Sequence, residues 1–206
     1  MASNYHIKSY CHIKNQTVSL NGQIVFEDDS KLFPDFIKNA YRALDTKYAK
    51  FFKMDNLSKL AFLAADILLK NADLPPTKEH NIALIFSNRA SSLETDRKHQ
   101  NTISDPDNYY PSPSLFVYTL PNICLGEISI KHKLLSENSF FIFDRFNADH
   151  LLLNSSYLLN NNKAEKALCG WVDLDGNDYN AFLYLVGENG AINHNTEEIT
   201  RLYNSL

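Results

Sequence analysis

Hydrophobic and polar positions follow one another along the chain in patterns that predict strands and helices in mixed order. Near the start, residues 17–20 and 23–26 flank an Asn-Gly pair. Alternating runs around Asn-Gly are the strongest short signal for a β-hairpin, because both turn positions must accept a positive φ angle. Residues 7–13 predict a further strand, and apolar residues at helical spacing predict a first helix over residues 34–44.

The clearest single element is a helix over residues 56–70. Its apolar side chains lie on most of its circumference, so the helix must be covered on both sides. Asp55 is the expected N-cap and Asn71 the expected C-cap, and the prolines at positions 75 and 76 prevent its continuation.

Short apolar runs predict further strands, and helical patterns lie between them. The runs cover residues 82–86, 140–143, 167–172 and 181–186, and helices are expected to start near Asn122, at Asn147 or Asp149, and after a cap at Thr196. The polar stretch over residues 87–113 is long for a connection, so it predicts a functional loop or a short helix. This alternation predicts an α/β layer architecture with a mixed sheet, and no linker divides residues 1–206.

Composition and charge argue against several classes of protein. Hydrophobic residues make up 44% of the chain, which supports a globular core, and a net charge of −4 argues against nucleic-acid binding. No apolar run approaches the roughly 20 residues of a membrane span, and the N-terminus has no signal-peptide pattern. Three widely spaced cysteines, Cys11, Cys124 and Cys169, indicate reduced thiols and a cytoplasmic protein.

Motif chemistry reveals no active site, and we expect neither a cofactor nor a metal. The seven histidines are scattered, and residues 173–178 predict a turn between two strands rather than a calcium loop. A reactive thiol needs a base and a helix N-terminus or cation. Cys124 lies in the first turn after Asn122 and Cys169 lies among apolar neighbours, so packing is the favoured interpretation of both.

Two segments resemble the β-ketoacyl-acyl-carrier-protein synthases. Residues 52–65, FKMDNLSKLAFLAA, are similar to the family's R-M-D-x-x-S-x-x-A-x-x-A-A helix, and residues 113–130, PSLFVYTLPNICLGEISI, to its segment ending in N-x-x-x-G-x-I-x-I. The resemblance implies an α/β, three-layer half of a thiolase-like fold, with a mixed five-stranded sheet and helices on its faces. Residues 1–206 would form a single domain like the N-terminal half of a ketosynthase.

The resemblance also implies that the catalytic residues are missing. In the family, a nucleophilic Cys follows a buried strand and begins a helix. Here that strand is residues 138–143, and the nucleophile position is occupied by Arg145, with Asp144 and Phe146 beside it. Residues 143–147 contain no Cys, Ser or Thr, and the family's C-terminal half, with its histidines and lysine, has no counterpart. We therefore expect no condensing activity.

Family members dimerise through the strand before the nucleophile. In this chain the dimer strand contains no charge to protect its edge, and it consists of Ser139, Phe140, Phe141, Ile142 and Phe143. The resemblance implies a chain-length-factor-like accessory subunit in fatty-acid, polyene or polyketide biosynthesis. Its expected partner is an active ketosynthase, or a second copy, with acyl carrier protein as a further candidate. The expected binding residues are Asn122, Arg145 and Asn147.

Two alternatives remain open at this point. One is a small acyltransferase or thioesterase using Cys124 or Cys169 with His132 or His150, and the other is a self-associating domain without an acyl ligand. A lone thiolase half would also expose the sheet face that its missing half covers. That exposure requires a partner or a rearranged covering helix.

Overall fold

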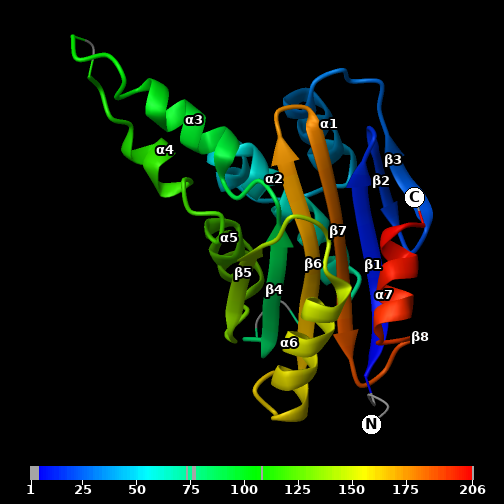
Figure 1. Cartoon of the computed structure of the whole chain (residues 1–206). Helices are drawn as coiled ribbons and strands as arrows, with labels where there is room; N and C mark the ends of the chain where they lie inside the picture. The colour runs from blue at the N-terminus through cyan, green and yellow to red at the C-terminus, as the bar shows by residue number, and fades with distance from the viewer. Residues whose placement is uncertain (1–4, 73, 76–77, 108, 206) are drawn as a thin grey trace.

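A computed structural model describes residues 5–72, 74–75, 78–107 and 109–205. Within these residues one mixed sheet of eight strands runs through the molecule in the order β3-β2-β1-β7-β6-β4-β5, with β8 paired to β1 (Figure 1). The strands are β1 (His6–Lys14), β2 (Thr17–Leu20), β3 (Gln23–Glu27), β4 (Ile82–Asn88), β5 (Asn138–Ile142), β6 (Lys166–Asp175), β7 (Asp178–Gly187) and β8 (Ile192–Asn193). Only β4 pairs in parallel, with β5 and β6, and the other pairs are antiparallel.

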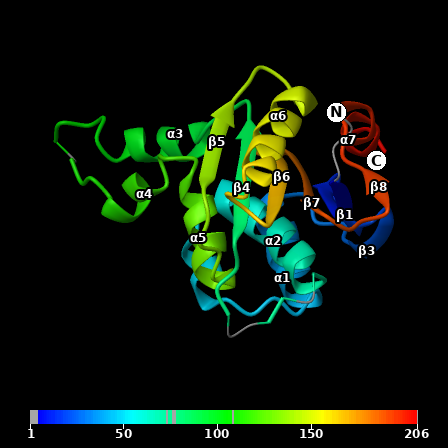
Figure 2. The same cartoon turned by 90° about the horizontal axis from the view of Figure 1, so that it is seen from below.

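Helices cover both faces of the sheet and give three layers, as predicted (Figure 2). They are α1 (Phe33–Ala43), the 3-10 helix η1 (Ala49–Lys53), α2 (Asn56–Lys70), α3 (Leu93–Asn101), α4 (Pro113–Val117), α5 (Ile123–His132), α6 (Ala148–Asn160) and α7 (Thr196–Tyr203). Helices α1, α2 and α5 share one apolar core with the sheet, and α6 and α7 share the second core on the other face. No helix in the described part of the chain is long and apolar enough to cross a membrane.

The mixed sheet is confirmed, but it has eight strands instead of the five predicted. The five strands β1, β7, β6, β4 and β5 form its continuous centre and one end. The hairpin β2–β3 extends it beyond β1, because Asn21 and Gly22 adopt the positive φ angles (52° and 81°) of the predicted tight turn. The two-residue strand β8 pairs with the start of β1.

Helix α2 confirms the prediction made from its apolar pattern. Thirteen of its fifteen residues are buried, between the sheet on one side and α1 and α5 on the other. Asp55 is the N-cap, where its Oδ1 accepts a hydrogen bond from the Ser58 N–H at 2.9 Å, and Asn71 is the C-cap. The cap of α7 was predicted one residue too late, because the side chain of Asn195 accepts the bond from the Glu198 N–H.

Two segments that the sequence predicted only in outline, residues 87–113 and 173–178, have defined structures. The polar stretch 87–113 contains a short helix, α3, and residues 173–178 form the turned end of the β6–β7 hairpin.

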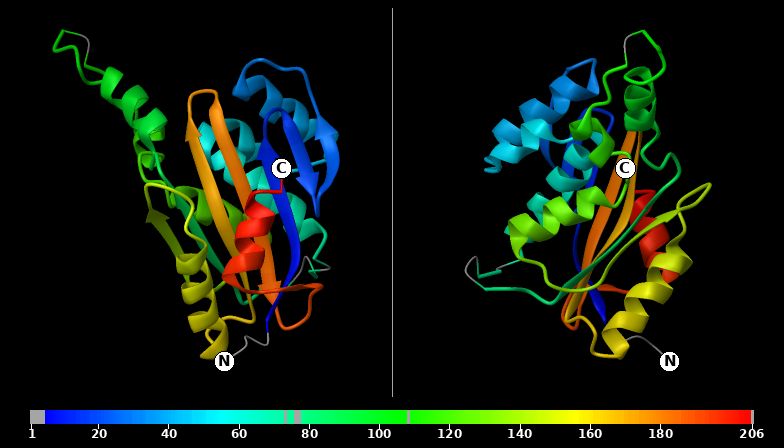
Figure 3. Two further views of the ribbon diagram at one scale, coloured as in Figure 1. Left: turned by 45° about the vertical axis from the view of Figure 1, so that its right-hand side comes forward. Right: turned by 90° about the vertical axis from the view of Figure 1, so that its left-hand side faces the viewer.

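The sheet face that a lone thiolase half would expose is covered by α6 and by α7, which lies across β1 and β7 (Figure 3). The buried side chains of Ile199 and Leu202 attach α7 to this face. Helices α6 and α7 therefore bury this face of the sheet within the described chain.

Candidate functional site

Arg145 lies in the short turn between β5 and α6, where the family pattern places a nucleophile. Its side chain is exposed and makes no hydrogen bond or ion pair with another described residue. A cavity of about 320 Å³ adjoins it and is lined by Arg145, Phe146, Asn147, Ala148, Asp149, Thr196 and Thr200. The N-terminal ends of α6 and α7 therefore meet at this turn.

Asn147, one of the two predicted caps, is the N-cap of α6, because its Oδ1 accepts a hydrogen bond from the His150 N–H at 2.9 Å. The first helical residue is Ala148, so Arg145 lies outside the helix, before the capping residue. A group at position 145 is thus not in the first helical turn, where free N–H groups stabilise an anion.

The turn is also covered by the last helix. The ring of Phe146 stacks on Tyr203 of α7, and the Tyr203 hydroxyl accepts a hydrogen bond from Asn180 Nδ2 at 3.1 Å. At the other end of α7, Thr196 Oγ1 donates to Asp149 Oδ1 at 2.6 Å. Sequence reasoning missed Tyr203, because no local pattern connects residues so far apart along the chain.

The three expected binding residues are only partly brought together. Arg145 and Asn147 line the same cavity, but Asn122 precedes α5, which packs in the core on the opposite face of the sheet. The side chain of Asn122 is exposed and makes no capping bond to α5. It therefore belongs to a different surface from the Arg145 turn.

All three cysteines are free and fully buried. Burial raises the pKa of the Cys11 and Cys124 thiols far above the usual range and raises that of Cys169 to about 12. Cys124 Sγ donates to the Pro121 carbonyl at 3.1 Å. These environments stabilise the protonated thiol and disfavour the thiolate that nucleophilic chemistry needs.

The two histidines considered as bases contact other groups. The His150 ring packs edge-on against Phe141 and Phe143 at centroid distances of 4.3 and 4.7 Å. His132 Nε2 lies 3.2 Å from Asp66 Oδ1. Within the described part of the chain, no group of three or more His, Cys, Asp or Glu side chains is placed to hold a metal ion.

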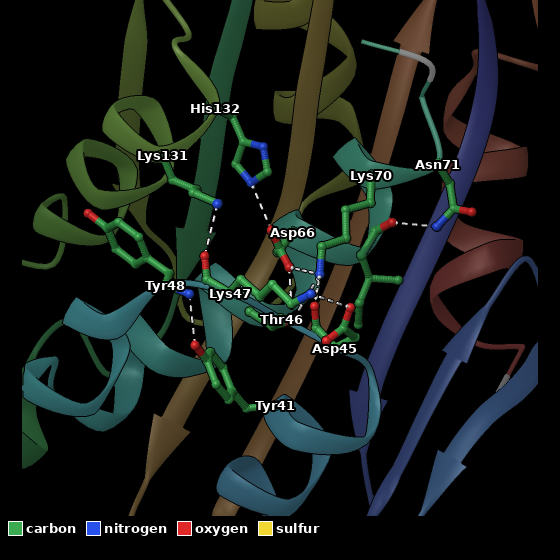
Figure 4. A network of polar contacts seen from close by, with 11 residues as sticks. Tyr41, Asp45, Thr46, Lys47, Tyr48, Asp66, Lys70, Asn71, Lys131 and His132 are labelled. Carbon is green, nitrogen blue, oxygen red and sulfur yellow. Dashed lines mark hydrogen bonds and ion pairs between the residues drawn. The ribbon is translucent and has the colours of Figure 1, made fainter. Parts of the chain in front are cut away.

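A buried carboxylate joins α2 to its neighbours (Figure 4). Asp66 is completely buried, and its Oδ2 accepts hydrogen bonds from Lys70 Nζ at 2.7 Å and Thr46 Oγ1 at 2.9 Å. Burial alone would raise the pKa of Asp66, but the contacts with His132, Lys70 and Thr46 outweigh it and hold this pKa below its usual range. A charged residue inside an apolar helix is the one sequence signal that could have predicted this network.

A second buried carboxylate, that of Glu127 in α5, holds this helix against its other neighbours. Glu127 is buried and accepts hydrogen bonds from the hydroxyls of Tyr48 and Tyr118, while Lys50 Nζ lies 2.7 Å from it. The two networks connect α5 to α2 and η1 through paired, hydrogen-bonded charges. They are structural, and they hold in place the helix that precedes β5.

Strand β5 lies at the end of the sheet, so none of the described strands pairs with its outer edge. It contains no charged residue, and Phe140 and Phe141 pack toward opposite cores. Ile142 is 49% exposed. The predicted dimer strand is thus an uncharged edge with a free row of backbone hydrogen-bonding groups.

No protein-family profile and no curated protein sequence matches the chain. Several solved structures, by contrast, match the chain. The ishigamide ketosynthase/chain length factor superposes with a TM-score of 0.62 at 14% identity, covering 90% of this chain and 62% of that one. A ketosynthase (ApeO) in complex with its chain length factor (ApeC) from Xenorhabdus doucetiae gives 0.58 at 13% identity, with 93% and 81% covered. A beta-ketoacyl synthase from Burkholderia phymatum gives 0.60 at 12% identity, with 92% and 60% covered.

The superpositions cover nearly all of this chain but less than two thirds of the first and third of those chains. The matched chain of the Xenorhabdus complex is shorter than these and only slightly longer than the present one. Identities this low establish the fold and nothing beyond it. The chain therefore has the thiolase-like fold of the ketosynthases, over part of their length.

Proposed function

We propose that this chain is a non-catalytic, chain-length-factor-like accessory subunit that pairs with an active ketosynthase-like chain in fatty-acid, polyene or polyketide assembly. The observation that carries the proposal is the outer edge of β5, which is uncharged and pairs with no strand in the described part of the chain. Monomeric proteins protect such edges with charges, prolines, bulges or covering elements. Addition of a partner's strand would continue the sheet and satisfy this row of backbone groups.

Several of the similar structures support this partner class. Two of them are a ketosynthase with a chain length factor, and a third is a ketosynthase with an acyl-carrier protein. The Xenorhabdus complex contributes a matched chain close to this one in length. The fold of this chain is therefore one that a subunit of such a complex can have.

The non-catalytic role rests on the turn before α6. It contains no nucleophilic side chain, lies outside the helical turn that would stabilise an anion, and is covered by Tyr203. The buried thiols do not replace the missing group, since their pKa values are raised by burial. This arrangement disfavours the alternative of a cysteine-dependent acyltransferase or thioesterase.

Arg145 has a separate proposed role. Its guanidinium is exposed and has no ion-pair partner among the described residues, so it is available to a carboxylate or phosphate of a partner. A carrier-protein phosphopantetheine phosphate is the candidate group. An Arg145→Ala variant that binds a holo-acyl carrier protein and the ketosynthase as tightly as the wild type would refute this role.

Co-expression with a full-length ketosynthase-like chain from the same genome tests the proposed function. Native mass spectrometry should show a one-to-one complex, and the complex should contain all of the condensing activity. A chain that stays monomeric, or forms only homodimers, in the presence of every such ketosynthase would contradict the proposal. A homodimer would favour the self-associating alternative.

A further inference from the structure

A small cavity lies between the C-terminal ends of α2 and α5, on the face of the sheet opposite α6 and α7. Its volume is about 220 Å³, and its lining residues are Asp66, Leu69 and Lys70 of α2, Lys131 and His132 of α5, and Leu74 and His80 of the segment that leads to β4. Cavities for drug-sized ligands usually exceed about 300 Å³, so this one suits a smaller molecule.

The walls of the cavity are joined by backbone hydrogen bonds. The His80 N–H donates to the Lys133 carbonyl at 2.9 Å, and the Leu135 N–H donates to the His80 carbonyl at 2.9 Å, which fixes His80 beside the end of α5. Lys133 ends this helix in the left-handed conformation, with a φ angle of 54°. The chain thus forms the cavity by itself, and a molecule that enters it has little of the chain to order.

Positive charge exceeds negative charge among the described lining residues, although the whole chain has a net charge of −4. Their one carboxylate is that of Asp66, which pairs with Lys70 Nζ at 2.7 Å. Lys131 pairs with no carboxylate in the described part of the chain, and its Nζ donates to the Lys47 carbonyl at 2.9 Å. Since an ammonium group has three N–H donors, Lys131 retains donors for a ligand. Basic residues also complement helix C-termini, but this bond leads away from α5, to a carbonyl outside it.

The two histidines of the cavity each use one ring nitrogen within the protein. His132 Nε2 lies 3.2 Å from Asp66 Oδ1, and the other ring nitrogen of His132 is turned away from Asp66 (Figure 4). His80 Nε2 lies 3.0 Å from the Pro75 carbonyl oxygen. The second nitrogen of a protonated imidazole is a donor, so each ring can offer one N–H to a negatively charged group.

Ionisable groups at this depth are costly for the fold. Asp66 is completely buried, and the His132 side chain is only 13% exposed. Apolar residues in place of a buried ion pair often keep or raise stability, so such a cluster is weak evidence of a purely stabilising role. Ionisable side chains that line a cavity and have specific charged partners are, on physical grounds, candidates for a binding site.

We propose that this cavity binds a small oxyanion, a carboxylate or phosphate group on a short carbon skeleton. Lys131, His80 and His132 donate to its oxygen atoms, and the carbon skeleton packs on Leu69 and Leu74. Asp66 orients the His132 ring and does not contact the ligand. Neither the β5 edge nor a partner chain enters this site, so it is independent of the proposed function.

The test is a titration of the full chain with sodium phosphate and with sodium butanoate at constant ionic strength. The ring-proton NMR signals of His80 report binding at the site, and the unfolding midpoint reports stabilisation by the ligand. The site variant carries Lys131→Gln and His132→Gln, in which the Gln side-chain amide can still donate to Asp66. The control variant carries Lys38→Gln on α1 and His6→Gln on β1, the same two changes at a distance from the cavity.

We expect at least one probe to shift the His80 signals and to raise the unfolding midpoint of the wild type. The site variant should bind that probe at least roughly 10-fold more weakly, and the control variant should bind it like the wild type. Binding of phosphate alone would assign a phosphate group to the site, and binding of butanoate alone would assign a carboxylate.

Three results would overturn the inference and leave the proposed function intact. They are no binding of either probe at millimolar concentrations, binding by the site variant that equals that of the wild type, and equal losses in the site and control variants. If the double site variant does not fold, Lys131→Gln alone gives the same comparison, because its ammonium group makes no ion pair with a described residue.

Discussion

The rings of Phe146 and Tyr203 lie flat against each other, with centroids 3.9 Å apart and planes inclined by only 8°. One ring belongs to the turn between β5 and α6, and the other belongs to the last helix of the described chain. Through this pair, α7 covers both the turn and the adjoining sheet face. The same contact therefore fixes α7 against the turn and the sheet, while Arg145 beside it stays exposed.

Truncation of Tyr203 should destabilise the chain. Tyr203→Ala removes the stacked ring and leaves Phe146 and Phe182 exposed, so we expect the free energy of unfolding to fall by roughly 2–4 kcal/mol. Tyr203→Phe keeps the ring and loses only the hydrogen bond from Asn180, with an expected loss of about 0.5–1.5 kcal/mol. Urea unfolding measures both values, and equal stability of the two variants would show that the stacked ring contributes nothing.

The three cysteines should be unreactive in the folded chain. Burial raises the pKa of every thiol, so a thiol-directed reagent at pH 8 should modify much less than one cysteine per chain until denaturant is added. Reaction kinetics followed by mass spectrometry give this result directly. Rapid labelling of Cys124 or Cys169 in the native state would revive the cysteine-dependent enzyme as a hypothesis.

Asp66 should contribute to stability in a pH-dependent way. Folding lowers the pKa of Asp66. Its contribution to the free energy of unfolding is therefore fully present above about pH 5, and it is lost as the pH falls through the lowered pKa of the folded chain. Asp66→Asn should lower stability at pH 7 by roughly 2–4 kcal/mol, because Lys70 loses its buried counter-charge.

The matched control for Asp66 is an exposed carboxylate. Asp45→Asn alters a pair with Lys47 whose side chains are both mostly exposed, so its effect should stay below about 1 kcal/mol. If Asp66→Asn and Asp45→Asn have the same effect on thermal unfolding at pH 7, the buried network is not stabilising.

Two buried histidines should make the chain sensitive to acid. Burial lowers the pKa of both His12 and His194 to about 4, whereas the unfolded value is about 6.5. Below pH 6.5 the unfolded chain therefore binds more protons, and stability should fall as the pH drops from 6.5 to 4. His12→Phe keeps the ring stacked on Phe182 and should flatten this slope between pH 6.5 and 4. An unchanged slope would contradict the buried, neutral state of His12.

The sequence predicts the elements that depend on local signals. The Asn-Gly hairpin, the cap of α2 at Asp55 and the cap of α6 at Asn147 each follow from a few adjacent residues, and all three are present. The resemblance to ketosynthases rests on two local segments and predicts the fold correctly. It also places the uncharged edge strand before the turn at Arg145.

Contacts between distant residues could not be predicted in this way. Stacking of Phe146 on Tyr203 depends on how segments far apart along the chain fold back in space. The five-strand count implied by the family resemblance left out the hairpin β2–β3, which the local Asn-Gly pattern predicts, and the two-residue strand β8. The separation of Asn122 from Arg145 could not be predicted either, because the sequence of a helix does not show which face of the sheet it covers.

The central claim is that the outer edge of β5 pairs with a ketosynthase-like chain. Its most direct test is a titration of that partner with Ile142→Lys, which places a charge on the exposed edge, and with Ile24→Lys, the same change on the opposite edge strand β3. The account predicts that Ile142→Lys weakens binding at least about 10-fold, whereas Ile24→Lys binds like the wild type. Equal affinities for the two variants and the wild type would contradict it.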